Sequence, residues 1–153
     1  MLKNQKGITL IALVITIIVL LILAGITITM LSSQDSAPNK AAEAKIINDV
    51  GAAKDAVGLT ASSALQEWYS TKYTATTLPE NFPATAQDAV LAANYSSAKV
   101  TITKDTSGDT KKIIIKSTEG RSSDSNKYSV TGEVSNAGGI TWKDGEWQAE
   151  SGN

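Results

Sequence analysis

The chain contains no cysteine and no histidine, and these two absences exclude several kinds of protein. Without cysteine there are no disulfides, so packing or contact with neighbouring molecules has to hold a folded domain together. Without either residue type, most nucleophile, general-base and metal-ligand schemes are excluded. A carboxylate pair such as Glu80 and Asp88 stays conceivable, but no motif places these residues in one pocket. The sequence therefore predicts a protein that is not an enzyme and that holds no metal and no cofactor.

Clustered positive charge is also missing. Arg121 is the only arginine, and 14 basic side chains face 15 acidic ones, for a net charge of −1. Nucleic-acid binding through a basic patch needs lysine and arginine gathered on one surface. The composition therefore predicts no such partner.

Calcium binding finds little support either. Asp105 and Asp109 flank Gly108, which faintly suggests a calcium loop. Calcium needs six to eight oxygen ligands, and the spacing of an EF-hand is absent. We therefore interpret this stretch as a polar turn between two strands.

What the chain does have is a long apolar run near its start. The 24 residues from Ile8 to Leu31 include no charge, proline or aromatic ring, and Asp35 is the first charged residue after Lys6. As a helix they would span roughly 36 Å, enough to cross the hydrocarbon core of a bilayer. A secretory signal peptide has a shorter apolar core followed by small residues at its cleavage site. The residues after Leu31 match that site poorly, so the sequence predicts a retained membrane helix.

The charges before the apolar run indicate its orientation. Lys3 and Lys6 lie on its N-terminal side. Because cytoplasmic flanks are enriched in lysine and arginine, we expect this end in the cytoplasm and the rest of the chain outside.

A second helix is predicted from about residue 39 to residue 73. Ser36-Ala37-Pro38 marks its start, because serine caps helices and proline suits a first helical turn. Pro38 either begins a separate helix or kinks one long helix that starts near Ile8, and we favour the kink. Apolar residues recur at spacings of three and four, as in a helix with one buried stripe, at Ile46, Val50, Ala53, Val57, Ala61, Ala64 and Trp68.

The rest of the chain indicates a loop followed by strands. Pro79 and Pro83 bracket a polar loop, with a short helix expected at 87–93. Alternating or β-branched runs predict strands at 99–104, 112–116, 128–134, 140–142 and 146–148. Asp144-Gly145 favours a tight hairpin between the last two strands, which would bring Trp142 near Trp147. We also expect Trp68, Tyr69 and Tyr73 to pack in the core.

These elements give an α+β fold class: a long N-terminal helix, first membrane-spanning and then amphipathic, packed on a small antiparallel β-sheet. The predicted organisation is a leader at 1–7, a hydrophobic helix at 8–34, an amphipathic helix at 35–74, a loop region at 75–98 and a sheet region at 99–153.

The junction at the head of the apolar helix carries a family resemblance. Lys6-Gly7-Ile8-Thr9-Leu10-Ile11 resembles the prepilin leader junction of type IV pilins and pseudopilins. That resemblance implies cleavage by prepilin peptidase between Gly7 and Ile8, with N-methylation of Ile8. The order of a long helix followed by a sheet also resembles the fold of this family. In its lack of cysteine the chain resembles Gram-positive members.

The resemblance implies a structural subunit of an extracellular filament. The chain would be anchored in the cytoplasmic membrane as a single-pass precursor and would then polymerise with copies of itself through the pilus assembly machinery. Such pili serve in adhesion and motility. The alternatives are a minor pilin or a pseudopilin of a secretion or DNA-uptake system, or a membrane-anchored adhesin that does not polymerise.

The chain departs from the family at Ala12, the fifth residue after the expected cut. Most members have a glutamate there, which is thought to pair with the N-terminal amine of a neighbouring subunit. A buried carboxylate is costly unless it is paired, so the usual glutamate acts as a registration device. Without it, this chain is either a minor subunit or one whose subunits register by packing alone.

The family resemblance also suggests where the apolar helix would open in a filament. The candidate zone lacks the proline often found there but contains poor helix formers. We expect helical pairing to be lost in the filament over Leu23, Ala24, Gly25, Ile26, Thr27, Ile28 and Thr29.

Overall fold

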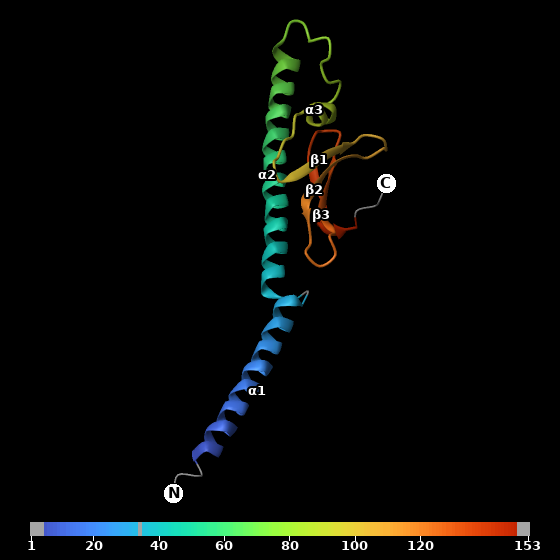
Figure 1. Cartoon of the computed structure of the whole chain (residues 1–153). Coiled ribbons are helices and arrows are strands. Elements are labelled where there is room, and N and C mark those ends of the chain that lie inside the picture. Colours follow the sequence, from blue (N-terminus) through green and yellow to red (C-terminus); the bar gives the residue numbers. More distant parts are fainter. Residues whose placement is uncertain (1–4, 34, 150–153) are drawn as a thin grey trace. The chain divides into compact units, whose positions relative to one another are not determined.

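The computed structural model describes residues 5–33 and 35–149, and for residues 5–9, 31 and 32 it describes the backbone alone. Contacts divide the chain into two compact units, Met1–Ala41 and Ala42–Asn153 (Figure 1). The chain is α+β, with a long apolar N-terminal helix and a small antiparallel sheet. The coarse prediction of fold class is therefore confirmed.

The first unit is built around helix α1, which spans Gln5–Ser32. The next helix, α2, begins at Ala37 and ends at Thr74. The preference for one kinked helix was therefore wrong, because helical pairing stops at Ser32 and Pro38 lies in the first turn of a separate helix. Proline has no amide hydrogen to donate, and the first turn of a helix is where that costs nothing.

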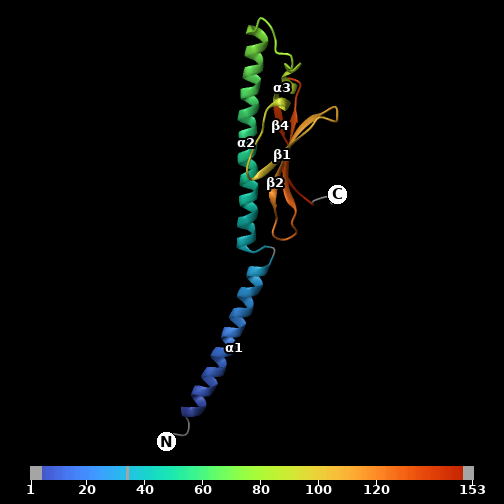
Figure 2. The same cartoon turned by 45° about the horizontal axis from the view of Figure 1, so that its top comes forward.

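From Ala42 onward, α2 belongs to the second unit and carries the predicted apolar stripe. Its buried side chains are Ile46, Val50, Ala53, Val57, Ala61 and Trp68, and Ala64 is half-buried. The sheet lies along one side of this helix in both views (Figures 1 and 2). A helical period of 3.6 residues aligns these side chains on a single face, and that face packs on the sheet.

A short helix, α3 (Ala86–Ala92), follows the loop after α2. Thr85 caps it, because the Thr85 hydroxyl accepts a hydrogen bond from the Asp88 amide at 3.1 Å. The buried Gln87 side chain donates to the Val134 carbonyl at 2.6 Å, which joins α3 to the sheet. The predicted helix at 87–93 is confirmed one residue earlier.

The sheet has five strands: β1 (Val100–Asp105), β2 (Lys111–Gly120), β3 (Lys127–Val134), β4 (Ile140–Trp142) and β5 (Glu146–Gln148). Its order is β1-β2-β3-β4, all pairs are antiparallel, and β5 also pairs with β3. The five predicted strands are thus confirmed to within a few residues.

The predicted hairpin between the last two strands was wrong. β4 pairs with Gly132–Val134 and β5 pairs with Lys127–Ser129, so both lie along the same edge of β3. Three residues, 143–145, separate Trp142 from Glu146, whereas two separate their partners on β3, so the interruption is a one-residue bulge. Trp142 and Trp147 therefore follow one another along one edge rather than facing each other across a turn.

The core lies between α2 and the sheet. Val50 and Val57 of α2 are almost fully buried, and so are Ile113 and Ile115 of β2 and Val90 of α3. Since these side chains come from three elements far apart in the sequence, the core is the product of non-local contacts.

Strand β3 requires a glycine where it pairs with β4. Gly132 pairs directly with Trp142, and a Cβ atom at Gly132 would lie 2.7 Å from Ile140 Cγ2 and 2.8 Å from the Trp142 ring. We expect Gly132→Ala to lower the free energy of unfolding by about 1–3 kcal/mol, because overpacking displaces both neighbours. Urea denaturation followed by tryptophan fluorescence would measure this loss. Gly108→Ala is the matched control, since a Cβ there meets nothing closer than 4.0 Å, and equal losses in the two variants would contradict the packing argument.

Candidate functional site

Helix α1 is the strongest candidate for a functional segment. Its stretch Leu10–Met30 has 21 residues, a mean hydropathy of 3.2 and no residue buried within the chain. At 1.5 Å per residue this stretch measures about 31 Å, which matches the hydrocarbon core of a bilayer. Length and composition therefore allow α1 to cross a membrane.

The three threonine hydroxyls within Leu10–Met30 are satisfied by the helix itself. The Thr16 hydroxyl donates to the Leu13 carbonyl at 2.8 Å, and the Thr27 hydroxyl donates to the Leu23 carbonyl at 2.7 Å. The Thr29 hydroxyl donates to the carbonyls of Ile26 at 2.9 Å and of Gly25 at 3.1 Å. An unpaired hydroxyl costs free energy in an apolar medium. These bonds remove that cost, so the helix can expose threonines to an apolar environment.

The same bonds bear on the zone predicted to open in a filament. Residues 23–29 are α-helical, and Thr27 and Thr29 bond to carbonyls within this zone. Serine and threonine bonding back to the preceding turn competes with the helical ladder. The opening was predicted for an assembled filament, so it stays a prediction.

The processing junction lies at the start of α1. Gly7 and Ile8 belong to the first turns of the helix by their backbone, and so does Lys6. Lys3 lies outside the described residues. The predicted cleavage and methylation stay predictions.

Ala12, where the family has its glutamate, lies on α1 with an exposed side chain. Gly25 is also open, because a Cβ atom there would meet nothing within 4 Å. Between Leu10 and Met30 α1 carries no charged side chain. This stretch therefore offers apolar contact on every side and no charged group that could form an ion pair.

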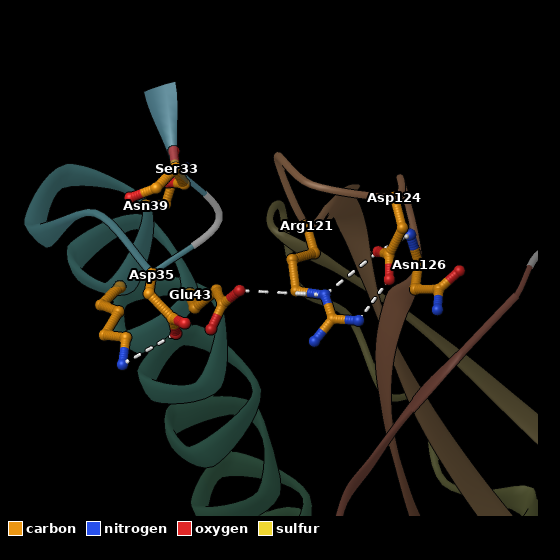
Figure 3. Close-up of polar contacts among 8 residues, drawn as sticks. Ser33, Asp35, Asn39, Glu43, Arg121, Asp124 and Asn126 are labelled. Carbon is orange, nitrogen blue, oxygen red and sulfur yellow. Dashed lines mark hydrogen bonds and ion pairs between the residues drawn. The ribbon is translucent and has the colours of Figure 1, made fainter. Parts of the chain in front are cut away.

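A short break separates α1 from α2, and Ser33, Asp35 and Ser36 lie outside both helices. Here the Ser33 carbonyl accepts hydrogen bonds from the Ser36 amide at 3.0 Å and from Asn39 Nδ2 at 3.1 Å. Asp35 and Lys40 form an ion pair at 3.2 Å (Figure 3). These local contacts satisfy polar groups where the helical ladder stops, as capping residues do elsewhere.

Two of the acidic residues considered for catalysis or metal binding, Asp88 and Asp105, accept hydrogen bonds within the chain. Asp88 accepts hydrogen bonds from the Thr85 hydroxyl at 2.7 Å and from Lys111 Nζ at 2.8 Å, and the Lys111 bond is the main reason that its pKa is lowered. Glu80 lies exposed in the loop before α3. Asp105 accepts from the Ser107 hydroxyl and amide, which lowers its pKa and forms the expected polar turn. Within residues 5–33 and 35–149, no group of three acidic side chains could hold a metal.

The aromatic residues at the end of α2 were predicted to be core residues, and this is confirmed only for Trp68. Its indole nitrogen donates to the Pro83 carbonyl at 2.9 Å, and its ring stacks on Phe82. Tyr69 and Tyr73 are exposed and stack on each other, with ring centroids 6.4 Å apart. Their spacing of four places both tyrosines on one face of α2, and the Tyr69 ring also lies edge-on to Trp68, with ring centroids 4.9 Å apart.

The pair Gly51 and Gly58 is a second unusual feature, this time in α2. A Cβ atom at either position would meet nothing within 4 Å, so packing within the chain does not require a glycine there. Each costs about 1 kcal/mol of helix stability relative to alanine.

Comparison with known protein families, curated proteins and solved structures finds no match to this chain.

Proposed function

We propose that the chain is a structural subunit of a type IV pilus-like extracellular filament. One observation carries the proposal: the 21-residue, strongly apolar stretch Leu10–Met30 of α1 is exposed in the single chain. Exposure of so much apolar surface to water is unfavourable, so α1 has to be covered by lipid or by other proteins. A filament subunit uses both covers in turn, lipid before assembly and neighbouring copies of α1 afterwards.

The junction Lys6-Gly7-Ile8 supports this proposal over a plain membrane anchor. An anchor needs no particular residue at its cytoplasmic end. A substrate of prepilin peptidase needs a short basic leader and a glycine at the scissile bond, and this chain offers both. The helix-then-sheet plan is compatible with the pilin fold.

In this proposal α1 bundles with copies of itself while the sheet domain lies outside the bundle. Partners are the prepilin peptidase, the cytoplasmic membrane, the assembly machinery and further copies of the chain. Because α1 has no carboxylate at Ala12, the bundle registers by packing of apolar side chains. A minor subunit that initiates filaments is the second candidate, and Ala12 favours it.

A lysine in the middle of α1 separates anchoring from assembly. Fourteen leucine, isoleucine and valine residues lie within Leu10–Met30, and together they favour insertion by about 4–8 kcal/mol, whereas one central lysine costs about 3 kcal/mol. We therefore expect Leu20→Lys to stay in the membrane fraction. We expect it to form no filaments, because a bundle would bury the charge unpaired.

The measurement is electron microscopy of the sheared surface fraction, alongside membrane flotation, in cells that supply the peptidase and the assembly machinery. Leu20→Ala is the control and should give both the membrane signal and the filaments. If the unmodified chain is abundant in membranes but absent from sheared filaments, it is a membrane-anchored adhesin and the proposal fails.

A further inference from the structure

Residues 42–45 of α2 are attached to the rest of the second unit differently from the residues that follow them. Within the described part of α2, Ile46 is the first buried apolar side chain. Residues 42–45, between the start of the second unit and Ile46, are exposed or half-buried. Two ion pairs join them to the end of the sheet: Glu43 with Arg121 at 3.8 Å, and Lys45 with Glu119 at 3.6 Å.

Arg121 is held in place by its own loop. Its backbone amide donates to the Asn126 carbonyl at 2.7 Å, and its carbonyl accepts from the Ser125 amide at 2.8 Å. Ser125 has a positive φ of 59°, and a Cβ atom at Gly120 would collide with the Ser125 carbonyl, so the loop closes tightly. The guanidinium is therefore presented by a fixed backbone.

Three groups converge on this guanidinium. Asp124 binds it through both carboxylate oxygens, and Glu43 reaches it from α2 (Figure 3). The guanidinium carbon also lies 5.2 Å from the centre of the Trp147 ring. The hydrogen bond to Asp124 raises the pKa of Arg121 and lowers that of Asp124, so both stay charged. Arginine suits such a position, since its planar fork binds a carboxylate and stacks on a ring at once.

We propose that Arg121 is a latch that fastens residues 42–45 of α2 to the sheet through Glu43 and can release them without opening the core. Release uncovers no buried apolar side chain, because the apolar stripe begins at Ile46. The second ion pair adds little, since Lys45 and Glu119 are both about two-thirds exposed. The latch therefore decides whether residues 42–45 of α2 are held against the sheet or released from it.

Hydrogen exchange of the full-length chain in detergent micelles tests the latch. In Arg121→Gln we expect the amides of residues 42–46 to exchange about fivefold faster, the change in equilibrium that loss of one half-buried ion pair gives. Amides of residues 53–61, the part of α2 in which Ala53, Val57 and Ala61 are buried in the core, should not change. Glu43→Gln should have the same effect, and the double variant should add nothing further, because the two residues act through one contact.

Two controls make the test specific. Lys111→Gln removes an ion pair with Asp88 elsewhere in the head and should leave residues 42–46 unchanged. Added sodium chloride should speed exchange at 42–46 in the unmodified chain but not in Glu43→Gln, because salt screens a contact that the variant lacks. Unchanged exchange at 42–46 in Glu43→Gln would overturn the latch, and so would equal acceleration at 53–61. If Arg121→Gln does not fold, Glu43→Gln decides alone, since it leaves Arg121 paired with Asp124.

Discussion

Valine in place of Gly7 is expected to leave the precursor uncut, with Met1 still present and Ile8 unmethylated. A peptidase binds its substrate in extended form, and the Gly7–Ile8 bond lies within the first turns of α1. The first turn of a helix opens readily because its amides lack helical partners. Glycine then fits a narrow site, whereas the branched side chain of valine obstructs it. Mass spectrometry of the N-terminal peptide, after co-expression with a prepilin peptidase, measures the result.

Gly25→Val provides the matched control within the same helix. A Cβ atom at Gly25 meets nothing within 4 Å, so this substitution should fold, insert and be processed normally. An intact Met1 on the unmodified chain would refute the processing claim outright. Cleavage of Gly7→Val at the normal rate would show that the glycine is only an interfacial residue before an anchor.

Ile113→Ala is expected to cause a large loss of stability. The Ile113 side chain is completely buried in the core between α2 and β2. Removing its outer carbons leaves a cavity, and such changes cost about 2–5 kcal/mol of unfolding free energy. Urea denaturation followed by fluorescence reports this loss, because all three tryptophans, Trp68, Trp142 and Trp147, lie in the second unit.

The neighbouring Ile114 offers a control with the same chemical change. Ile114 points to the opposite face of the sheet, pairs with Thr103 and Thr131, and is only half-buried. We expect Ile114→Ala to cost about 1 kcal/mol or less. Equal losses at the two positions would mean that the core does not lie on the face assigned to it.

The mistaken hairpin shows where local sequence signals stop being sufficient. Asp144-Gly145 has the composition of a tight turn, yet it forms a bulge along β3. A Cβ atom at Gly145 would overlap the Tyr128 ring, so close approach to β3, and not turn geometry, demands the glycine. Asp-Gly shows only that the backbone can bend sharply at this point. Pairing with the partner strand decides whether the bend becomes a hairpin turn or a bulge.

The polar sites show the same limit. The Asp88 carboxylate accepts hydrogen bonds from Thr85 and from Lys111, and no sequence pattern predicted the second, which joins positions 23 residues apart. Nothing in the sequence connects Glu43 with Arg121, which are 78 positions apart. Ion pairs of this kind leave no periodic signal, because each depends on one pair of positions brought together by the fold.

The sequence by itself determined the apolar helix, its length, the stripe on α2 and the existence of five strands. These features are local: an apolar run or a period of 3.6 or 2 residues is set by neighbours along the chain. The processing junction is proposed from the sequence alone. The structure adds only that the apolar surface of α1 is not covered within the chain. Tertiary structure alone decided the joint edge formed by β4 and β5, the exposure of Tyr69 and Tyr73, and the contacts of Arg121. Those depend on which distant segments meet, and burial and pairing energies between them outweigh local preference.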